Sequence, residues 1–299
     1  MATKCFSIYL PDILRTNVRG GVFIDDSSFY LSDFHNGYEL EYVFPNICKP
    51  KLLSQFFSPD VWNHMINLAG SKPGGTPVIV QMKESGIENL IMLAEGAKGA
   101  TAGVDYFNMN KIYTPPNRYN SKVAGLDGSI YYYGYWINPS WFNAYKDMLQ
   151  KELTFSPISD EKNKQYERAI LQTNSVGVHI RRGDFVALNW ALPEEYYQKT
   201  FMDVQKMLPH ASYFIFSDDI GWCKNNYAKL GIPKNTVFVE GNYDRKNNYI
   251  DMQLMTMCKV LIVGSSSFSY LASLLNTQEG FTAINVRNPL QEDISLDLY

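Results

Sequence analysis

Two arginines and a carboxylate follow a short apolar run in the middle of the sequence. Val176–Ile180 consists mainly of the small and β-branched residues typical of a strand buried on both faces, and it includes His179. Arg181, Arg182 and Asp184 come directly after this run. Guanidinium groups match phosphate oxygens in pairs and stay charged, so two adjacent arginines indicate a ligand with at least two negative charges. The alternative is a strand end whose arginines pair with surface carboxylates.

Two further polar segments also follow strand-like runs. Ser217–Asp219 comes after Tyr213–Phe216, and the serine-rich turn Gly264–Ser269 comes after Val260–Val263. A Gly-Ser turn that enters a helix offers backbone N–H groups and a positive dipole end to a phosphate, although ordinary N-capping by serine is the alternative. Since ligands bind at the carboxyl ends of the strands in parallel sheets, we expect the three segments to share one edge. That edge would suit a nucleoside diphosphate.

The acidic pair Asp218 and Asp219 has a second interpretation. These carboxylates, like the pair Asp25 and Asp26, could hold Mg²⁺, but helix capping and turn formation are the favoured roles. The sequence contains neither a P-loop nor a G-x-G-x-x-G after a strand, which argues against a P-loop NTPase and a Rossmann dehydrogenase.

Strand-like and helix-like segments alternate in the second half of the chain, which predicts an α/β fold with a doubly wound parallel sheet. The expected strands cover 176–180, 213–216, 236–239, 260–263 and 283–286, and the expected helices cover 161–171, 251–258 and the segment from the serine turn to 275. The first half predicts short strands at 22–24, 78–80, around 112 and at 131–133, with a partly helical segment over 51–68 and a helix over 140–153. A polar segment at 156–160 predicts two domains, 1–155 and 156–299.

Composition narrows the class of protein. The chain has 299 residues, 45% of them apolar, which suffices for two cores of ordinary size. The net charge of -3 gives no basic field for nucleic acid. The four cysteines lack zinc-ligand spacing, and no leader-like or 18-residue apolar segment is present, so we expect free thiols and a cytoplasmic protein without a transmembrane segment.

Three ordered blocks resemble the α-1,2-fucosyltransferase family, glycosyltransferase family 11. His179–Asp184 resembles the family's His-x-Arg-Arg-x-Asp signature, Phe216–Asp219 with Trp222 resembles its second block, and Asp251–Ser269 contains the third. Weaker N-terminal features also resemble the family, at Asn36–Leu40 with Phe44 and at Gly134–Trp136.

This resemblance implies a GT-B-like fold, in which two Rossmann-like domains enclose a cleft. It implies an inverting transfer of L-fucose from GDP-L-fucose to the 2-hydroxyl of a galactose-containing glycan acceptor, without a metal or another cofactor. Residues 1–155 would form the acceptor-side domain and 156–299 the donor-binding domain. The location expected for such an enzyme is the cytoplasm or the inner face of a bacterial membrane.

The resemblance also implies roles for individual residues. Arg182 with Arg181 would neutralise the diphosphate leaving group, and His179 with Asp251 would read the guanine. The remaining donor-binding residues would be the first three of the turn's four serines and the acidic pair, namely Ser265, Ser266, Ser267, Asp218 and Asp219. From the residues alone, Asp251 could instead cap a helix, and His179 could be a hydrogen-bonded core imidazole.

The general base is expected to be Asp184, which would take the proton of the acceptor hydroxyl. The neighbouring positive charges make this carboxylate a weaker base, so orienting Arg181 or Arg182 is its alternative role. Other carboxylates that could serve are Glu194, Glu195, Asp25 and Asp26.

The sequence departs from the family pattern in three places. Ser265 replaces an asparagine, and Tyr270-Leu271 replaces two tryptophans. The family's first strand and its Gly-Gly-Leu-Gly-Asn-Gln loop have no counterpart before Phe6. We therefore expect either an active transferase or a homologue that binds GDP or GDP-fucose with impaired or no turnover, because its N-terminus is incomplete or altered.

Overall fold

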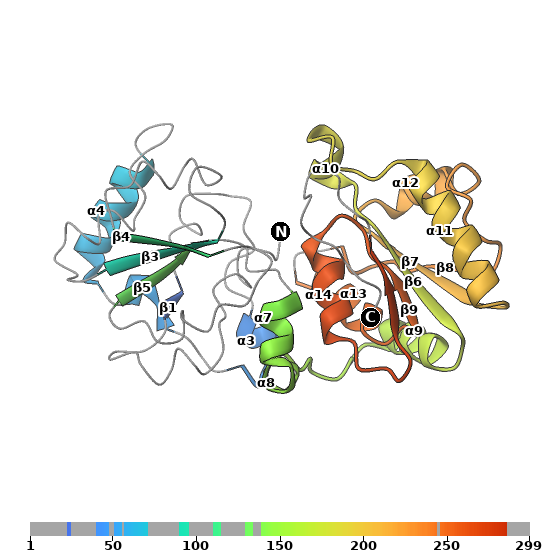
Figure 1. Ribbon diagram of the computed structural model, residues 1–299, viewed down its shortest axis with the longest axis horizontal. Coiled ribbons are helices and arrows are strands. Elements are labelled where there is room, and N and C mark those ends of the chain that lie inside the picture. The colour runs from blue at the N-terminus through green and yellow to red at the C-terminus, as the bar shows by residue number, and fades with distance from the viewer. Residues whose placement is uncertain are drawn as a thin grey trace. The chain divides into compact units, whose positions relative to one another are not determined.

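The computed structural model describes residues 23–24, 40–47, 51–55, 57–70, 90–95, 110–114, 129–133, 139–243 and 246–285. Figure 1 shows the helices and strands of this part of the chain. The chain divides into two compact units, Met1–Thr154 and Phe155–Tyr299. The expected boundary lay one residue later, between 155 and 156.

Parallel strands form the two small sheets of the first unit. Strand β3 (Leu90–Glu95) lies between β4 (Asn110–Thr114) and β5 (Ser129–Tyr133), and β1 (Phe23–Ile24) pairs with β2 (Lys51–Leu52). The patterns at 22–24, 112 and 131–133 predicted β1, β4 and β5. The central strand β3 was not predicted, and the strand expected at 78–80 lies outside the described residues.

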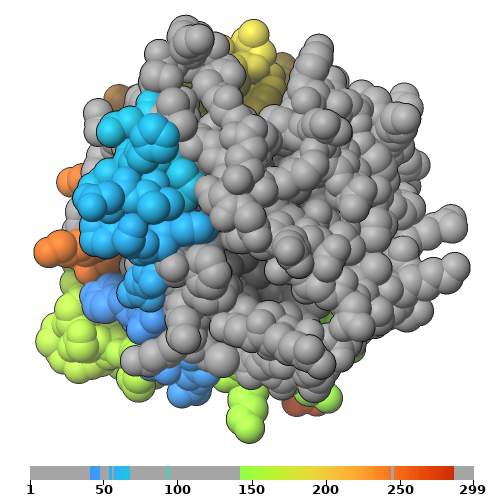
Figure 2. All heavy atoms as spheres, turned by 90° about the vertical axis from the view of Figure 1, so that its left-hand side faces the viewer, coloured from blue at the N-terminus to red at the C-terminus, as the bar shows by residue number. Residues whose placement is uncertain are grey.

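The helices of the first unit are short except for one. They are α3 (Leu40–Val43), the 3-10 turn η1 (Leu53–Gln55), α4 (Pro59–Gly70), α7 (Pro139–Ala144) and α8 (Lys146–Glu152). Helix α4 buries Trp62 and Met65, three residues apart, and exposes the residues between them at the surface seen in Figure 2.

The single helix expected over 140–153 is instead two helices, α7 and α8. Tyr145 separates them with φ −134, which is outside the helical range. Its backbone N–H donates to the carbonyl of Phe142, three residues back, so α7 closes in a tight final turn. The apolar spacing that predicted the helix persists across this break.

The second unit contains one five-stranded sheet in which every pair of neighbours is parallel. Its order is β10-β9-β6-β7-β8. The strands are β6 (Ser175–Ile180), β7 (Ser212–Ser217), β8 (Thr236–Phe238), β9 (Val260–Ile262) and β10 (Thr282–Ile284). All five predicted strands are present, and the α/β fold class with a parallel sheet is confirmed. The GT-B arrangement of two domains stays a prediction.

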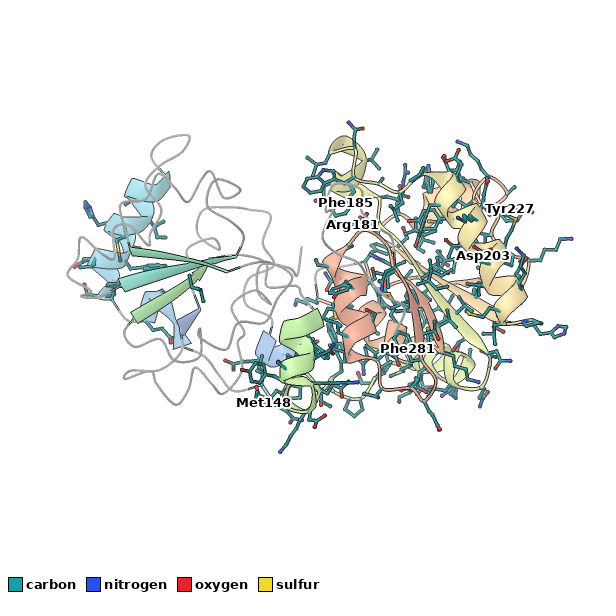
Figure 3. The ribbon with its side chains drawn as sticks, viewed as in Figure 1. Met148, Arg181, Phe185, Asp203, Tyr227 and Phe281 are labelled. Carbon is teal, nitrogen blue, oxygen red and sulfur yellow. The ribbon has the colours of Figure 1, made fainter. Side chains whose placement is uncertain are left out.

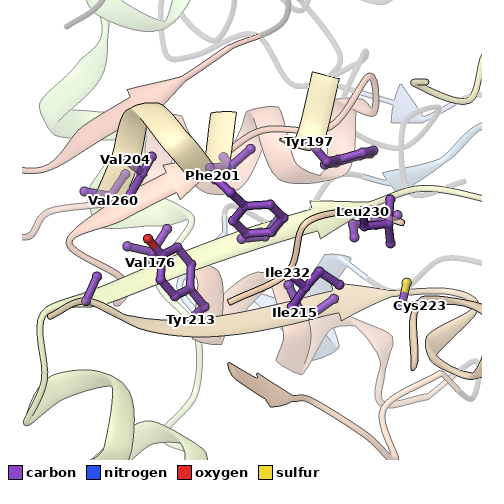
Figure 4. Close-up of a cluster of buried hydrophobic side chains, with 14 residues drawn as sticks. Val176, Tyr197, Phe201, Val204, Tyr213, Ile215, Cys223, Leu230, Ile232 and Val260 are labelled. Atoms are coloured by element: carbon purple, nitrogen blue, oxygen red, sulfur yellow. The ribbon is translucent and has the colours of Figure 1, made fainter. Parts of the chain in front are cut away.

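Helices cover both faces of this sheet. Helix α11 (Glu194–Met207) and α12 (Ile220–Asn225) pack on the face formed by alternate residues of the strands, such as Val176, Val178 and Ile215. Figure 4 shows this cluster, in which Tyr197, Phe201 and Val204 of α11 contribute most of the helical side. The cluster fixes the central strands from one side.

The other face of the sheet carries α9 (Glu161–Leu171), α13 (Asn248–Met255) and α14 (Ser267–Leu275), and α13 contacts both α9 and α14. Gly177 allows this close packing, because a Cβ there would lie 2.9 Å from both Cys258 Sγ and Leu261 Cδ1. The predicted helix over 161–171 matches α9. Helix α13 begins three residues before the predicted start at Asp251.

Candidate functional site

The ends of three neighbouring strands bring together the polar segments singled out in the sequence. Because the order is β9-β6-β7 and all pairs are parallel, the three carboxyl ends lie side by side. Arg181 and Arg182 follow β6, Asp218 and Asp219 follow β7, and Gly264 follows β9 after Val263. The expectation that these segments share one edge is therefore confirmed.

Arg181 lies between two carboxylates at this edge. Its Nη2 is 2.6 Å from Asp184 Oδ1, and its Nη1 is 2.9 Å from Asp218 Oδ2. Figure 3 shows Arg181 beside Phe185 of α10 (Gly183–Ala187), and the guanidinium carbon is 5.4 Å from the ring centroid. Asp184 thus contacts Arg181, the geometry required for its alternative role as an orienting carboxylate.

Arg182 is fixed by different partners. Its backbone N–H donates to Asp218 Oδ1 at 2.8 Å, and its guanidinium carbon lies 3.5 Å from the centroid of the Trp222 ring in α12. Its Nε is buried and has no hydrogen-bond partner among the described residues. Alternate side chains of β6, ending with Ile180, point toward α11 and α12. Arg182, two residues after Ile180, stacks on Trp222 of α12 and so lies on the same side of the sheet.

Gly183 lets Asp218 approach both arginines. It has a φ of +23, and a Cβ at this position would lie 2.5 Å from Asp218 Oδ2. A side chain here would push the carboxylate away from Arg181 and Arg182. This close contact is a steric reason for glycine at position 183 of the signature.

His179 is the last residue of β6 whose side chain faces α14. It is buried, and its Nδ1 lies 2.9 Å from Ser269 Oγ, which also accepts from the backbone N–H of Gly264. Burial, reinforced by the charge of Arg181, lowers the pKa of His179 to about 3, so the imidazole is neutral at physiological pH. These contacts agree with a hydrogen-bonded core imidazole, and they leave its proposed contact with guanine a prediction.

The serine turn makes capping and loop contacts. Ser266 is the N-cap of α14 and accepts from the backbone N–H of Phe268 at 3.2 Å, as the capping alternative predicted. Ser265 Oγ donates to the carbonyl of Trp190 at 3.0 Å, which connects the turn to the loop after α10. Ser267 is the first residue of α14. The turn therefore lies where a helix dipole points toward the strand ends.

Two of the remaining acidic candidates, Asp219 and Glu194, have clear partners. Asp219 caps α12 by accepting from the backbone N–H of Trp222 at 2.9 Å, the role favoured for it from the sequence. Glu194 Oε1 lies 2.9 Å from Lys229 Nζ, and this hydrogen bond lowers the pKa of Glu194. Glu195 follows in the first turn of α11, while Asp25 and Asp26 lie outside the described residues.

Asp251 is not the helix cap that the sequence left open. It is the fourth residue of α13, whose N-cap is Asn247. Burial raises the pKa of Asp251 to about 7, although a hydrogen bond from Asn242 acts in the opposite direction. The distance of that bond, from Asn242 Nδ2 to Asp251 Oδ1, is 2.8 Å. A buried carboxyl group with a perturbed pKa is typical of functional sites.

Sequence reasoning missed two residues connected to Asp251. Asn163 of α9 and Asn242, in the loop after β8, form a reciprocal pair of side-chain hydrogen bonds. They are 79 residues apart in the chain, so no local spacing could have linked them.

The sheet edge with two arginines and a helix N-terminus suits a nucleotide-sugar enzyme, and comparison with known families agrees. A model described as glycosyl transferase family 11 matches residues 106–295, more than half of the chain. The chain belongs to this family of glycosyltransferases.

Three relatives match parts of the sequence. The chain is 34% identical over 171 residues to an alpha-1,2-colitosyltransferase of Escherichia coli, a match that covers 54% of this chain and 57% of the relative. It is 30% identical over 129 residues to the O-antigen biosynthesis glycosyltransferase WbnK of Escherichia coli, with 41% of each chain covered. It is 24% identical over 153 residues to the galactoside 2-alpha-L-fucosyltransferase SEC1 of Bos taurus, covering 48% of this chain and 41% of the relative.

The chain spans about half the length of these curated relatives. A crystal structure of POFUT1 in complex with GDP-fucose aligns over 83% of this chain and 84% of its own, with 10% identity and a TM-score of 0.34, a score too low to bear on the fold. Among the described residues, no helix is long and apolar enough to cross a membrane.

Proposed function

We propose that this chain transfers L-fucose from GDP-L-fucose to the 2-hydroxyl of a galactose-containing glycan acceptor, with inversion and without a metal. One observation carries the proposal: the segments His179–Asp184, Ser217–Asp219 and Gly264–Ser269 lie at adjacent strand ends of one parallel sheet. These segments are the ones that resemble the fucosyltransferase blocks.

The two arginines would stabilise the diphosphate as it leaves. Arg181 contacts Asp184 and Asp218 through Nη2 and Nη1, and a guanidinium has further N–H donors that could bind phosphate oxygens. Arg182 carries a second charge, with its guanidinium plane fixed on Trp222. Charge stabilisation by fixed donors replaces what a divalent cation would supply in other transferases.

The N-terminus of α14 would bind the diphosphate from the second side. Ser266 caps this helix and Ser267 begins it, so their backbone lies at the positive end of the helix dipole. In this proposal Asp218 positions the arginines, since it accepts from Arg182 and pairs with Arg181. Asp219 supports the pocket by capping α12.

His179 and Asp251 would read the guanine. A carboxylate can accept from the ring N–H and the amino group of guanine together, which uracil and adenine cannot supply. Asp184 would then either serve as the general base or orient Arg181 by its 2.6 Å contact. That contact supports the orienting role.

A colitosyl donor is the second candidate, because the 34% identical relative is named an alpha-1,2-colitosyltransferase. Incubating the protein with a galactoside and either GDP-fucose or GDP-colitose, and measuring free GDP and the glycosylated product, tests both. We expect a 1,2-linked fucoside with GDP-fucose, formed equally well in EDTA.

Product only with GDP-colitose would favour the second candidate. Strict dependence on added Mg²⁺ or Mn²⁺ would contradict the metal-free mechanism. Binding of GDP-fucose without any product would favour the homologue that binds the donor but has no turnover.

A further inference from the structure

Two buried asparagines connect Asp251 to the start of helix α9. Asn163 and Asn242 are 4% and 3% exposed, which is unusual for side chains with this many polar atoms. Asn163 Nδ2 donates to Asn242 Oδ1 at 2.9 Å, and Asn242 Nδ2 donates to Asn163 Oδ1 at 2.8 Å. Burial of two amides is favourable only when their groups are paired, and this arrangement pairs them.

The second N–H of each amide points outward to a carboxylate. Asn242 Nδ2 donates to Asp251 Oδ1 at 2.8 Å, and Asn163 Nδ2 donates to Asp160 at 3.0 and 3.1 Å. Asp160 is itself fixed, because it is the N-cap of α9 and accepts from the backbone N–H of Asn163 at 2.9 Å. Asp160, Asn163, Asn242 and Asp251 thus form a continuous chain of hydrogen bonds, called here the amide relay.

The directions of these bonds leave one orientation for Asn242. Its oxygen is occupied by a donor from Asn163, so its nitrogen must face Asp251. The reversed amide would place the Asn242 oxygen against the acceptors Asp251 Oδ1 and Asn163 Oδ1, and its nitrogen against the donor Asn163 Nδ2. The amide relay therefore presents Asp251 Oδ1 with an N–H donor, and the ionised carboxylate can accept further hydrogen bonds on its remaining lone pairs.

We propose that Asn242, backed by Asn163, is the positioning residue that orients the Asp251 carboxylate for recognition of the donor's base. This inference rests on the proposed function, in which Asp251 accepts from guanine. The amide relay supplies two things that such recognition needs: a rotamer fixed by hydrogen bonds and an N–H donor that stabilises the charge of the carboxylate.

The local sequence explains why Asn242 reaches Asp251. Gly241 has a φ of +93, a conformation that side-chain-bearing residues rarely adopt, and it turns the chain in the loop after β8, which ends at Phe238. A Cβ at Gly241 would lie 2.8 Å from Lys162 Nζ, so the loop also lies against α9. The turn places Asn242 between α9 and α13.

The test is the ratio of GDP to UDP affinity, measured by calorimetry for the full chain and four variants. Asn242→Ala should lower this ratio about tenfold, since one charge-assisted hydrogen bond that orients the carboxylate is lost. If Asn242 had only a structural role, its loss would lower the fraction of folded protein. The apparent affinities for GDP and UDP would then fall equally, and their ratio would not change. Asn235→Ala is the matched control, because Asn235 precedes the same strand, β8, and its amide donates to the carbonyl of Ala211.

Should Asn242→Ala fail to fold, Asn163→Ala perturbs the relay one residue further from Asp251, which keeps its bond from Asn242. The expected ratio for Asn163→Ala is lower than that of the wild type, by less than about tenfold. An unchanged ratio in folded Asn242→Ala, or in folded Asn163→Ala where Asn242→Ala does not fold, would overturn the positioning role.

Asp251→Asn separates this inference from the function on which it rests. If Asp251→Asn lowers the ratio and the Asn242 variant does not, guanine recognition stands and the relay plays no part. If Asp251→Asn leaves the ratio unchanged, Asp251 does not read the base, and the proposed recognition and the relay's role both fail.

Discussion

The preference for GDP should depend on pH, because Asp251 titrates near neutrality. Its pKa of about 7 leaves roughly nine-tenths of the carboxyl groups ionised at pH 8 and roughly one-tenth at pH 6. Guanine offers two donors, so it requires the ionised form, and binding at pH 6 must first remove a proton. The affinity for GDP relative to UDP should therefore fall about tenfold from pH 8 to pH 6, or about 1.4 kcal/mol.

Calorimetry at both pH values, in two buffers with different ionisation enthalpies, measures this effect. GDP binding near pH 6 should release close to one proton from the protein, whereas UDP binding should not release this proton. Asp251→Asn is the control, since it cannot titrate and should show a ratio that is independent of pH. A wild-type ratio that stays constant across this range would refute the assignment of Asp251 to guanine.

The titration of Asp251 changes the stability of the fold with pH in the opposite direction to its effect on GDP binding. The folded state keeps the proton of Asp251 up to about pH 7, while the unfolded chain loses it near the usual value of 3.8. Its contribution to stability is fully present below about pH 4 and is lost as the pH rises through 7. Tighter GDP binding at pH 8 therefore cannot be attributed to a more stable fold through Asp251.

Three further predictions follow from the contacts at the sheet edge. Asp218→Ala should lower the free energy of unfolding in urea by about 1.5–3 kcal/mol, because it removes the acceptor for the Arg182 N–H and one partner of Arg181; no change would show that these bonds are weak. Gly264→Ala should cost about 1–3 kcal/mol in the same assay, since its Cβ would lie 2.8 Å from a backbone carbonyl, whereas Gly221→Ala, with 3.8 Å to its nearest atom, should cost less; equal costs would contradict the steric reason. Arg182→Lys should reduce kcat about tenfold or more in a GDP-release assay, because a lysine keeps the charge but loses the planar group; near-normal turnover would exclude this arginine from the reaction.

The sequence predicted the second unit in most of its elements. Strands β6, β7 and β9 are short apolar runs with polar segments at or just beyond their carboxyl ends, a local pattern that also predicts the position of the site edge. Helix α11 was missed, although Tyr197, Phe201 and Val204 repeat at helical spacing and two glutamates lie in its first turn. That signal was available in the sequence.

Other features could not be predicted from local patterns. The pairing of Arg181 with Asp218, and of Asn163 with Asn242, joins residues brought together only by the order of the strands and the packing of helices. The break between α7 and α8 occurs at Tyr145, within an apolar pattern that remains helical on both sides. For Asp251, an acidic residue ahead of an apolar run suggested a helix start, but the helix begins earlier, at Asn248.

Amide hydrogen exchange with and without GDP tests the central claim most directly, namely that the diphosphate binds where β6, β7 and β9 end. Saturating GDP should slow exchange in peptides that contain Arg182, Asp218 and Ser266, at the carboxyl ends of the three strands. Peptides at the opposite ends of the same strands, around Asn174 and Ala211, should be unaffected. Protection at those opposite ends, or no protection at the three segments despite measurable GDP binding, would contradict the account.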